Sequence, residues 1–393
     1  MSAASPSFVR TAPSEILPPP ATTGAVGWLR VNLFSSPFNI ALTIICGLLL
    51  VWIVPQLVKF LLIDAVWTGS NRDACLATPE RPEVGACWAF VREYINFFIY
   101  GSYPPDQRWR VNIFFVALAF GIAWLLWLDA PRRDYGAFYF FIVLPIMSFV
   151  LLHGMPALGL PIVETVMWGG LLVTLVVATV GIVASLPLGV LLALGRRSSM
   201  PVVRMLSVIY IEFVRGVPLI TVLFMASVML PLFLPEHFEI CYRKHCIEFT
   251  LSPEKLVRAL VGVALFSAAY MAEVVRAGLQ AIPRGQYEAA AAIGLRYWQT
   301  LRLVVLPQAL KITIPNIVSS AIGLFKDTTL VFIVGIFDLL KTAETARIDP
   351  NWATPVTSTT AYVFVALIYF VGCYGMSRYA RFVEARLAQG DRR

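Results

Sequence analysis

Charged side chains are scarce in this chain of 393 residues. Asp, Glu, Lys and Arg together make up 14% of it, whereas a soluble globular domain carries about 25%. Histidine occurs three times and cysteine six times. Hydrophobic residues make up 59%, and several apolar runs reach the roughly 20 residues that a membrane-spanning helix needs. The composition excludes a soluble domain and predicts an all-α integral membrane protein.

Motifs of catalysis are also missing. The sequence has no G-x-x-x-x-G-K-S/T phosphate loop, so it cannot act as its own ATPase through that motif. It also lacks H-E-x-x-H, G-x-S-x-G and C-x-x-C-H. We therefore expect a chain that is not an enzyme and that holds no metal and no cofactor of its own.

The basic residues lie at the ends of apolar runs. The formal net charge is +8, but Lys and Arg gather between spans, as the positive-inside rule predicts for cytoplasmic loops. This placement argues against a nucleic-acid partner and for membrane lipid. Basic connections at 132–133, 196–204 and 277–311 and the basic end 378–393 fall on one side if both termini are cytoplasmic.

We predict about eight spans, three in an N-terminal part and five in a core. Residues 1–37, rich in Pro, Ser, Thr and Ala, are predicted to be a disordered cytoplasmic tail, and residues 382–393 a second cytoplasmic tail. The predicted spans are Phe38–Phe60, Val111–Trp127, Phe138–His153, Trp168–Leu194, Leu219–Leu234, Leu256–Val275, Ile312–Phe337 and Thr360–Tyr379.

Two long connections fall on the outward side of this topology, and each contains two cysteines. Residues 67–110 hold Cys75 and Cys87, and residues 235–253 hold Cys241 and Cys246. Pairs confined to one outward loop suggest local disulfides in an oxidising periplasm. Metal binding by Cys241 and Cys246 with His237 and His245 is the alternative. Cys46 and Cys373, within apolar spans, are expected to be buried small hydrophobes.

The connection 277–311 is too polar to lie in lipid. Its sequence predicts a short helix of small residues, then a bend at a glycine, then a new helix with proline in its first turn. The residues that define it are Glu288, Ala289, Ala290, Gly294, Leu306 and Pro307. This run resembles the EAA loop of bacterial ABC importer permeases, which contacts the ATPase. An ordinary amphipathic helix on the membrane surface is the alternative interpretation.

Charged residues within or beside the core spans are candidates for a substrate pathway, because charge is costly in lipid. Glu212 and Arg215, and likewise Glu273 and Arg276, lie three residues apart and can pair on one helix face. Ion pairs that only anchor the helices are the alternative.

Lys326, Asp327 and Thr328 lie deep in an apolar run and suit a zwitterionic amino acid. Asp327 is the leading candidate for the ligand of the substrate's ammonium group. Mutual neutralisation by Lys326 is opposed by their adjacent positions, since neighbouring helical residues point to different faces. Pro315 and Gly323 are expected to loosen this helix.

These segments, Y-I-E-F-V-R-G-V-P-L at 210–219, A-Y-M-A-E-V-V-R at 269–276 and K-D-T-T-L at 326–330, resemble the core of polar amino-acid ABC permeases over residues 164–381. Val217 and Thr329 replace the family's commoner Thr and Ser. The N-terminal extension 38–160, with three spans and the loop 67–110, resembles a permease subunit of the general L-amino-acid transport system of proteobacteria.

The resemblance implies a permease in the bacterial inner membrane that imports L-amino acids, polar or of broad range. Its implied partners are a cytoplasmic ATPase dimer that binds ATP and Mg, a periplasmic binding protein and a second permease subunit that forms a heterodimer with this chain. Two alternatives remain open. An ion-coupled secondary carrier would explain the charges within the spans, and a non-transporting scaffold would explain the coupling loop.

Overall fold

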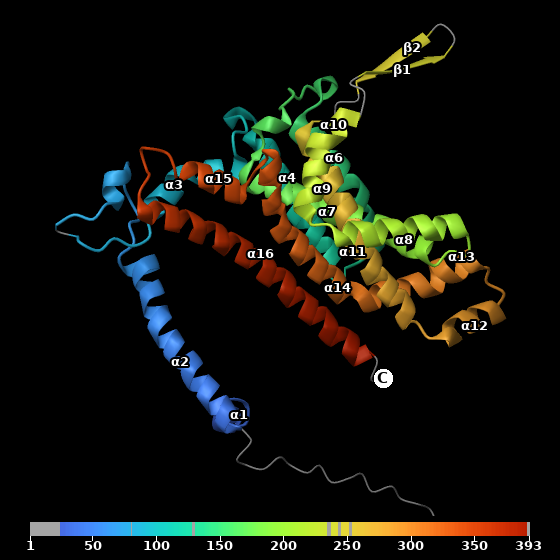
Figure 1. The fold of residues 1–393 in the computed structure, drawn as a ribbon, viewed down its shortest axis with the longest axis horizontal. Helices are drawn as coiled ribbons and strands as arrows, with labels where there is room; N and C mark the ends of the chain where they lie inside the picture. Colours follow the sequence, from blue (N-terminus) through green and yellow to red (C-terminus); the bar gives the residue numbers. More distant parts are fainter. Residues whose placement is uncertain are drawn as a thin grey trace, which may run out of the picture. The chain divides into compact units, whose positions relative to one another are not determined.

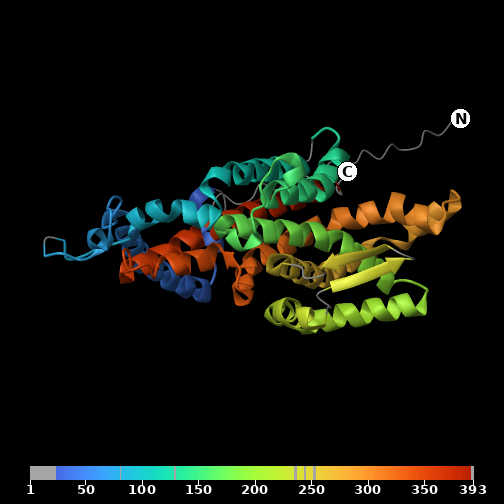
Figure 2. The ribbon, with the colours of Figure 1, turned by 90° about the horizontal axis from the view of Figure 1, so that it is seen from above.

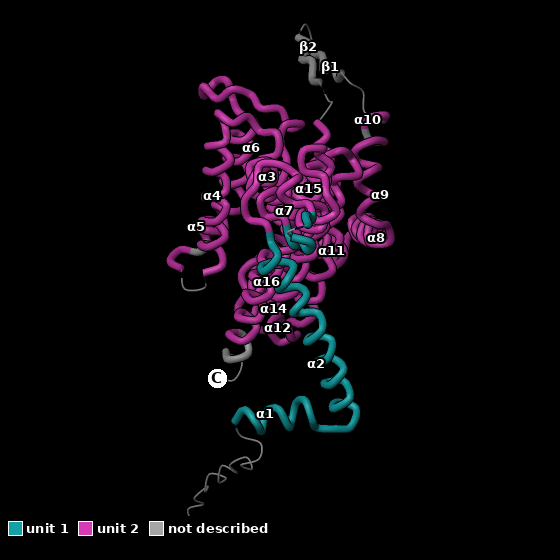
Figure 3. Tube along the Cα trace, turned by 90° about the vertical axis from the view of Figure 1, so that its left-hand side faces the viewer, with its two compact units in different colours: residues 1–65, 77–86 teal, residues 66–76, 87–393 magenta. Residues whose placement is uncertain are grey.

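The computed structural model describes residues 24–79, 81–127, 130–233, 237–242, 245–250 and 254–390, and most of them are helical (Figure 1). The chain divides into unit 1, residues 1–65 and 77–86, and unit 2, residues 66–76 and 87–393 (Figure 3).

The α-helices are α1 Gly24–Asn32, α2 Pro37–Val58, α3 Trp88–Tyr100, α4 Arg108–Leu126, α5 Arg133–Phe138, α6 Leu144–His153, α7 Gly170–Arg196, α8 Pro201–Gly216, α9 Leu219–Phe224, α10 Leu230–Phe233, α11 Lys255–Ala281, α12 Arg284–Ala292, α13 Tyr297–Thr300, α14 Leu306–Asp327, α15 Leu339–Ala346 and α16 Pro355–Gly390. The strands are β1 His237–Tyr242, β2 His245–Thr250 and β3 Phe337–Asp338.

Seven helical runs in the described chain are long and apolar enough to cross a membrane, and a bent pair of helices makes an eighth candidate. The predicted all-α membrane fold with about eight spans is confirmed. The seven runs are Pro37–Ile63, Pro105–Leu126, Asp134–His153, Gly170–Arg196, Lys255–Ala281, Tyr297–Val334 and Pro355–Arg386.

The fifth predicted span, Leu219–Leu234, matches the helical run of α9, a π-turn and α10 over residues 219–233, but a sharp bend that was not predicted precedes it. Its apolar part, Leu219–Met229, forms the second arm of a pair with α8, and the two arms meet at 107°. The bend follows from the sequence Gly216-Val217-Pro218. Val217 is extended (φ −111°, ψ 137°), as expected for a residue before proline, and Pro218 has no N–H with which to continue α8.

Three of the four π-helical turns in the described chain each end two residues before a proline. In a π-turn the N–H bonds to the carbonyl five residues back, and Leu306 N accordingly donates to Leu301 O. The donor is thus the residue directly before the proline, and the proline, which has no N–H, follows within the same helical run. The turns are Tyr139–Val143 before Pro145, Met225–Met229 before Pro231 and Leu301–Val305 before Pro307.

The centre of unit 2 is formed by α7, α11 and α14. Glycines allow the helices to approach closely, since a Cβ on Gly189 would lie 2.7 Å from Met271 Cβ. On Gly278 it would lie 2.7 Å from the carbonyl oxygen of Ala309. Small residues at such contacts are typical of helix packing in membranes. At one end of this unit lie α12 and α13, and at the other end lie α3 and α15 (Figures 1 and 2).

Unit 1 contains α1 and α2. Residues 1–23 of the predicted tail lie outside the described residues, but the expectation of disorder as far as residue 37 was wrong for Gly24–Asn32, which form α1. None of the residues of α2 is buried, and Cys46 is exposed rather than buried as expected. Several contacts tie the residues that follow α2 to residues 77–86. Lys59 pairs with Glu83, and Arg81 donates to the carbonyl of Asp64.

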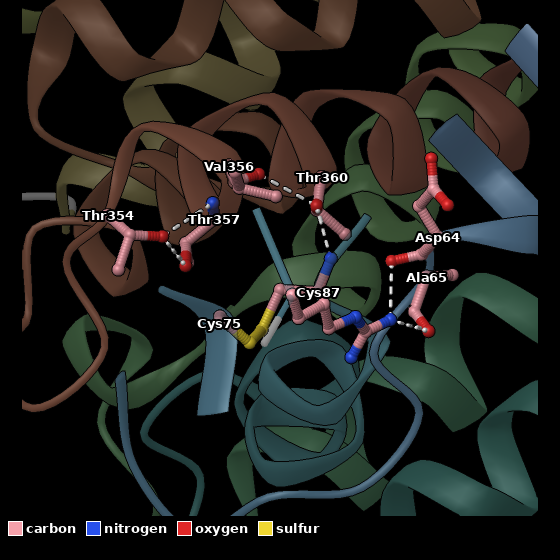
Figure 4. Close-up of a disulfide and its surroundings, with 9 residues drawn as sticks. Asp64, Ala65, Cys75, Cys87, Thr354, Val356, Thr357 and Thr360 are labelled. Carbon is pink, nitrogen blue, oxygen red and sulfur yellow. Dashed lines mark hydrogen bonds between the residues drawn. A yellow bond between two sulfur atoms is a disulfide. The ribbon is translucent and has the colours of Figure 1, made fainter. Parts of the chain in front are cut away.

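The connection 67–110 is not an open loop. It contains α3, whose Phe90 and Phe98 are fully buried, and Tyr94 of α3 donates a hydrogen bond to Asp349. Cys75 and Cys87 form a disulfide, with their Cα atoms 5.8 Å apart. The backbone N–H of Cys87 donates to Thr360 Oγ1 at 2.9 Å, so the disulfide-bonded segment is anchored to α16 (Figure 4).

The connection 235–253 contains the antiparallel hairpin of β1 and β2. Its register pairs Cys241 with Cys246 directly across the two strands. The side chains of this hairpin lie outside the described residues, so the disulfide between these cysteines stays a prediction, as does the metal alternative.

Loss of the disulfide is expected to destabilise the chain. The double variant Cys75→Ser/Cys87→Ser should lower the free energy of unfolding by about 2–4 kcal/mol, because the closed loop no longer restricts the unfolded chain. The measurement is thermal unfolding in detergent, with Cys46→Ser as the control for loss of a free thiol. An unchanged unfolding temperature in the double variant would contradict the structural role of the disulfide.

A buried carboxylate begins α15. Asp338 is fully buried, and its two oxygens accept hydrogen bonds from Leu340 N at 3.0 Å and Lys341 N at 3.1 Å. Burial raises the pKa of Asp338 to about 6, although these two donors oppose the shift. Because the folded state binds this proton more tightly than the unfolded state, stability falls as the pH rises from about 4 to about 6.

Replacing Asp338 by Asn should remove this pH dependence and keep one of the two cap hydrogen bonds, because the amide oxygen accepts whereas the amide nitrogen only donates. A shift of about two pH units corresponds to about 3 kcal/mol at neutral pH. Unfolding temperatures of the parent chain and Asp338→Asn should therefore converge towards pH 4 and differ at pH 7, with the variant the more stable. Asp73→Asn, an exposed carboxylate, serves as the control. A constant difference between parent and variant across this range would refute the assignment.

Candidate functional site

A cavity of about 430 Å³ lies within unit 2, between the bend after α8 and the helices α7, α11 and α14. The described residues around it include one charged side chain, that of Asp327, and hydroxyl groups from several helices. Its wall is formed by Ile182, Ser185, Val217, Pro218, Leu219, Phe266, Ser267, Tyr270, Met271, Ser320, Ala321, Gly323, Leu324, Asp327 and Leu330. The arrangement combines a mostly apolar pocket with a few polar groups, as ligand sites do.

Asp327 lines this cavity at the point where the helix changes type. It is the last residue of α14, and a 3-10 helix begins at Thr328. Pro315 and Gly323, which were expected to loosen this helix, do not end it, since α14 continues through both. Lys326 is exposed and is absent from the cavity wall. The two neighbouring charges therefore face different surroundings, as adjacent positions on a helix require.

Thr328 does not line the cavity. It is fully buried, and its hydroxyl contacts the carbonyl of Phe325 at 2.8 Å and the hydroxyl of Tyr369 at 3.2 Å. Thr328 therefore packs between helices and does not belong to the cavity wall, contrary to its predicted place in the substrate pathway. Four hydroxyls line the cavity instead, those of Ser185, Ser267, Tyr270 and Ser320, and the sequence analysis did not select them.

A second group of charges joins the ends of α7, α8 and α11. Arg196, the last residue of α7, donates from Nη1 to Glu212 and to Glu273, both at 2.8 Å. Arg276 Nη2 lies 2.6 Å from Glu273, as its spacing predicted. Arg215 Nη1 lies 3.8 Å from the same carboxylate. We call Arg196, Glu212, Arg215, Glu273 and Arg276 the charge cluster.

The charge cluster differs from the sequence prediction in its partners. Glu212 pairs with Arg196 of another helix rather than with Arg215 three residues away. Arg215 instead lies over the ring of Tyr270, 5.7 Å from its centre. The cluster residues do not line the described cavity, but Tyr270 does. The role of Arg196 in this cluster was not predicted, because a basic residue at the end of a span is also what the positive-inside rule places in a cytoplasmic loop.

The predicted coupling segment has the expected helix and bend. Helix α12 spans Arg284–Ala292, and Gly294 has φ +80°, a left-handed conformation that favours glycine. A new helical run then begins at Tyr297, with Gln299 accepting a hydrogen bond from the N–H of Arg296 at 2.9 Å. Helix α14 begins at Leu306 with Pro307 in its first turn, as predicted, but it continues without a break from the helical turns that begin at Tyr297.

One face of this segment is buried and the other is open. Ala290 is 3% exposed and packs on its own chain, whereas Glu288 and Ala289 are exposed. Ile293 and Trp298 are 76% and 69% exposed. Large exposed apolar side chains beside small ones indicate a surface that binds another protein. No motif in the sequence distinguishes Ile293 or Trp298 as site residues.

These features define a class of membrane transport protein. A cavity that contains a carboxylate lies beside a bent helix, and a separate polar segment has exposed apolar side chains.

The family model described as "Binding-protein-dependent transport system inner membrane component" matches residues 185–389. This chain therefore belongs to the family of inner membrane components of binding-protein-dependent transport systems, and it is a transport permease rather than a soluble protein. The family works with ATPase and binding-protein partners.

Relatives extend the match over most of the chain. An inner membrane amino-acid ABC transporter permease, YhdY of Escherichia coli, is 49% identical over 93% of this chain and 94% of its own length. A glutamate/glutamine/aspartate/asparagine transport system permease, BztC of Rhodobacter capsulatus, is 42% identical over 98% and 99%. The shorter glutamate/aspartate import permease GltK of Escherichia coli is 32% identical over 56% of this chain and 92% of itself. The rest of this chain has no counterpart in that relative.

Proposed function

We propose that this chain is the permease subunit of an ATP-driven importer of L-amino acids and that Asp327 binds the ammonium group of the substrate. The observation that carries the proposal is the position of Asp327, the charged residue of the cavity wall, at the end of α14. A carboxylate in such a cavity is costly unless it meets a cation or water. An ammonium group together with the surrounding hydroxyls meets that requirement.

The relatives support an amino acid as the substrate. One is named for amino acids in general, and the other for glutamate, glutamine, aspartate and asparagine. Two of those four side chains carry a negative charge and two are neutral. What all of them share is the backbone ammonium group, which is the group that Asp327 suits. A permease that recognises this shared group would accept a broad range of side chains.

ATP hydrolysis is assigned to separate subunits, because the sequence has no phosphate loop. The open face at Glu288, Ala289, Ile293 and Trp298 is the proposed contact with an ATPase dimer, which would carry the ATP and Mg. With the bent pair counted as one span, the number of spans is eight, and both termini then lie on the side of this contact, the cytoplasm. The disulfide of Cys75 and Cys87 would then face the periplasm and its binding protein.

A second permease subunit is also part of the proposal. Lys326 is exposed within the run Tyr297–Val334, and an ammonium group on a spanning helix is costly against lipid. Its face would meet a second permease chain or the water-filled path between the two chains. A related but different chain would give a heterodimer.

Removal of the charge of Asp327 tests the substrate site. Asp327→Asn should lower ATP-dependent amino-acid uptake in membrane vesicles by about 10- to 100-fold, the effect of losing a hydrogen bond to a charged group. Asp134→Asn, an exposed aspartate in α5, serves as the matched control. Uptake by Asp327→Asn at the parental rate would overturn the site. Uptake that continues without ATP but needs an ion gradient would favour the secondary carrier.

Charge reversal at Glu288 tests the ATPase contact. Glu288→Arg should reduce the amount of ATPase that co-purifies with the chain about tenfold, a loss of about 1.4 kcal/mol, because the reversed charge no longer complements the partner. Glu384→Arg makes the same change at an exposed position of α16 and should leave the yield of ATPase as in the parent. Equal yields from Glu288→Arg and the parent would remove the contact from the proposal.

A further inference from the structure

Two consecutive arginines at the end of α7 connect the coupling segment to the charge cluster. Arg197 Nη1 donates to the carbonyl of Leu279 at 3.3 Å and lies 3.5 Å from the hydroxyl of Tyr287 in α12. Tyr287 also packs on the apolar group formed by Val275, Leu279 and Leu301. Arg196, the preceding residue, holds Glu273 of α11. Arg197 and Arg196 thus form a continuous set of contacts from α12 to Glu273.

Three arginines share the carboxylate of Glu273, whose side chain is 15% exposed. Oε1 accepts from Arg196 at 2.8 Å. Oε2 lies 2.6 Å from Arg276 and 3.8 Å from Arg215. The contact of Arg215 is the longest, and its side chain is the most exposed of the three arginines, at 37%. It is therefore the contact that costs least to break, since exposed and longer pairs are weaker.

Arg215 also connects the cluster to the cavity. Its guanidinium group lies 5.7 Å from the centre of the ring of Tyr270, a distance at which a cation is attracted to an aromatic face. Tyr270 forms part of the cavity wall, as do Val217 and Pro218, which follow Arg215 at the bend. Release of Arg215 from Glu273 would thus affect both a side chain and a backbone segment of the cavity wall.

We propose that Glu273 is a positioning residue that couples the movement of α12 to the shape of the cavity, by holding Arg215 against Tyr270. When α12 moves, Arg197 and Arg196 move with it, and the hold of Glu273 on Arg215 changes. The cavity wall has two arrangements, with Arg215 held or released, and the partner at α12 selects between them. This inference rests on the proposed function, because it assigns the coupling of the same transporter.

The test uses the full complex, with partner permease, ATPase and binding protein, reconstituted into proteoliposomes. The readout is the uptake of an equimolar mixture of radiolabelled L-amino acids per ATP hydrolysed, a ratio that a purely structural defect would not change in correctly assembled complexes. Glu273→Gln should lower this ratio at least tenfold while the ATPase still co-purifies. Arg215→Gln, which leaves the two short contacts of Glu273 intact, should lower it similarly, and Arg215→Lys should restore most of it.

Arg204→Gln is the matched control, an exposed arginine on the same helix, and it should keep the parental ratio. A parental ratio in Glu273→Gln would overturn the inference, as would an equal loss in Arg204→Gln. If the Glu273→Gln complex does not assemble, the uptake per ATP hydrolysed of Arg215→Gln is the test. A parental ratio in Arg215→Gln then overturns the inference. If the parent complex itself shows no ATP-driven uptake, the proposed function fails rather than the coupling.

Discussion

Backbone hydrogen bonding in lipid is the constraint on which this structure depends. A spanning segment must satisfy its N–H and C=O groups within the protein, because the bilayer core offers no water. Prolines remove donors and so determine where a helix can continue. Three of them are accommodated by π-turns that keep the helical run continuous, and Pro218 instead ends α8 and turns the chain by 107°. The interrupted backbone at Val217 and Pro218 lines the cavity, which is where irregular backbone is tolerated in a membrane protein.

The second constraint is the free-energy cost of charged side chains within a membrane protein. Two arrangements of charged residues meet this constraint in the chain. In the charge cluster, two carboxylates meet three arginines, so that most of the charge is paired and the excess is a single positive charge. Asp327 shows the other solution, because its carboxylate meets a cavity rather than a partner of opposite charge in the described wall. Paired charges hold helices together, whereas a carboxylate that faces a cavity is available to a ligand. This difference separates the structural charges from the proposed substrate site.

The exposed surface of the coupling segment carries large apolar side chains, which a helix packed only on its own chain would bury. A helix that only lay on its own chain would bury its apolar residues, as Ala290 does, and expose polar ones. Ile293 and Trp298 are exposed instead, beside the bend at Gly294. The bend itself could be predicted, because glycine accepts a left-handed conformation that other residues avoid. The exposure of the two large side chains depends on how α12 packs against α13 and the π-turn Leu301–Val305, which no local pattern reveals.

The sequence by itself determined the membrane fold, the approximate spans, the helix and bend of the coupling segment, and the different faces of Lys326 and Asp327. These features depend on composition and on neighbours a few residues apart, so short-range physical rules were sufficient. Only the tertiary structure decided that Arg196 binds Glu273, 77 residues further along the chain, that Thr328 packs against Tyr369, and that Asp327 shares a cavity with the bend at Pro218. Each of these contacts joins helices distant in sequence. Which partner a charge or hydroxyl finds is set by how whole helices pack, because several candidates of equal chemistry compete for it.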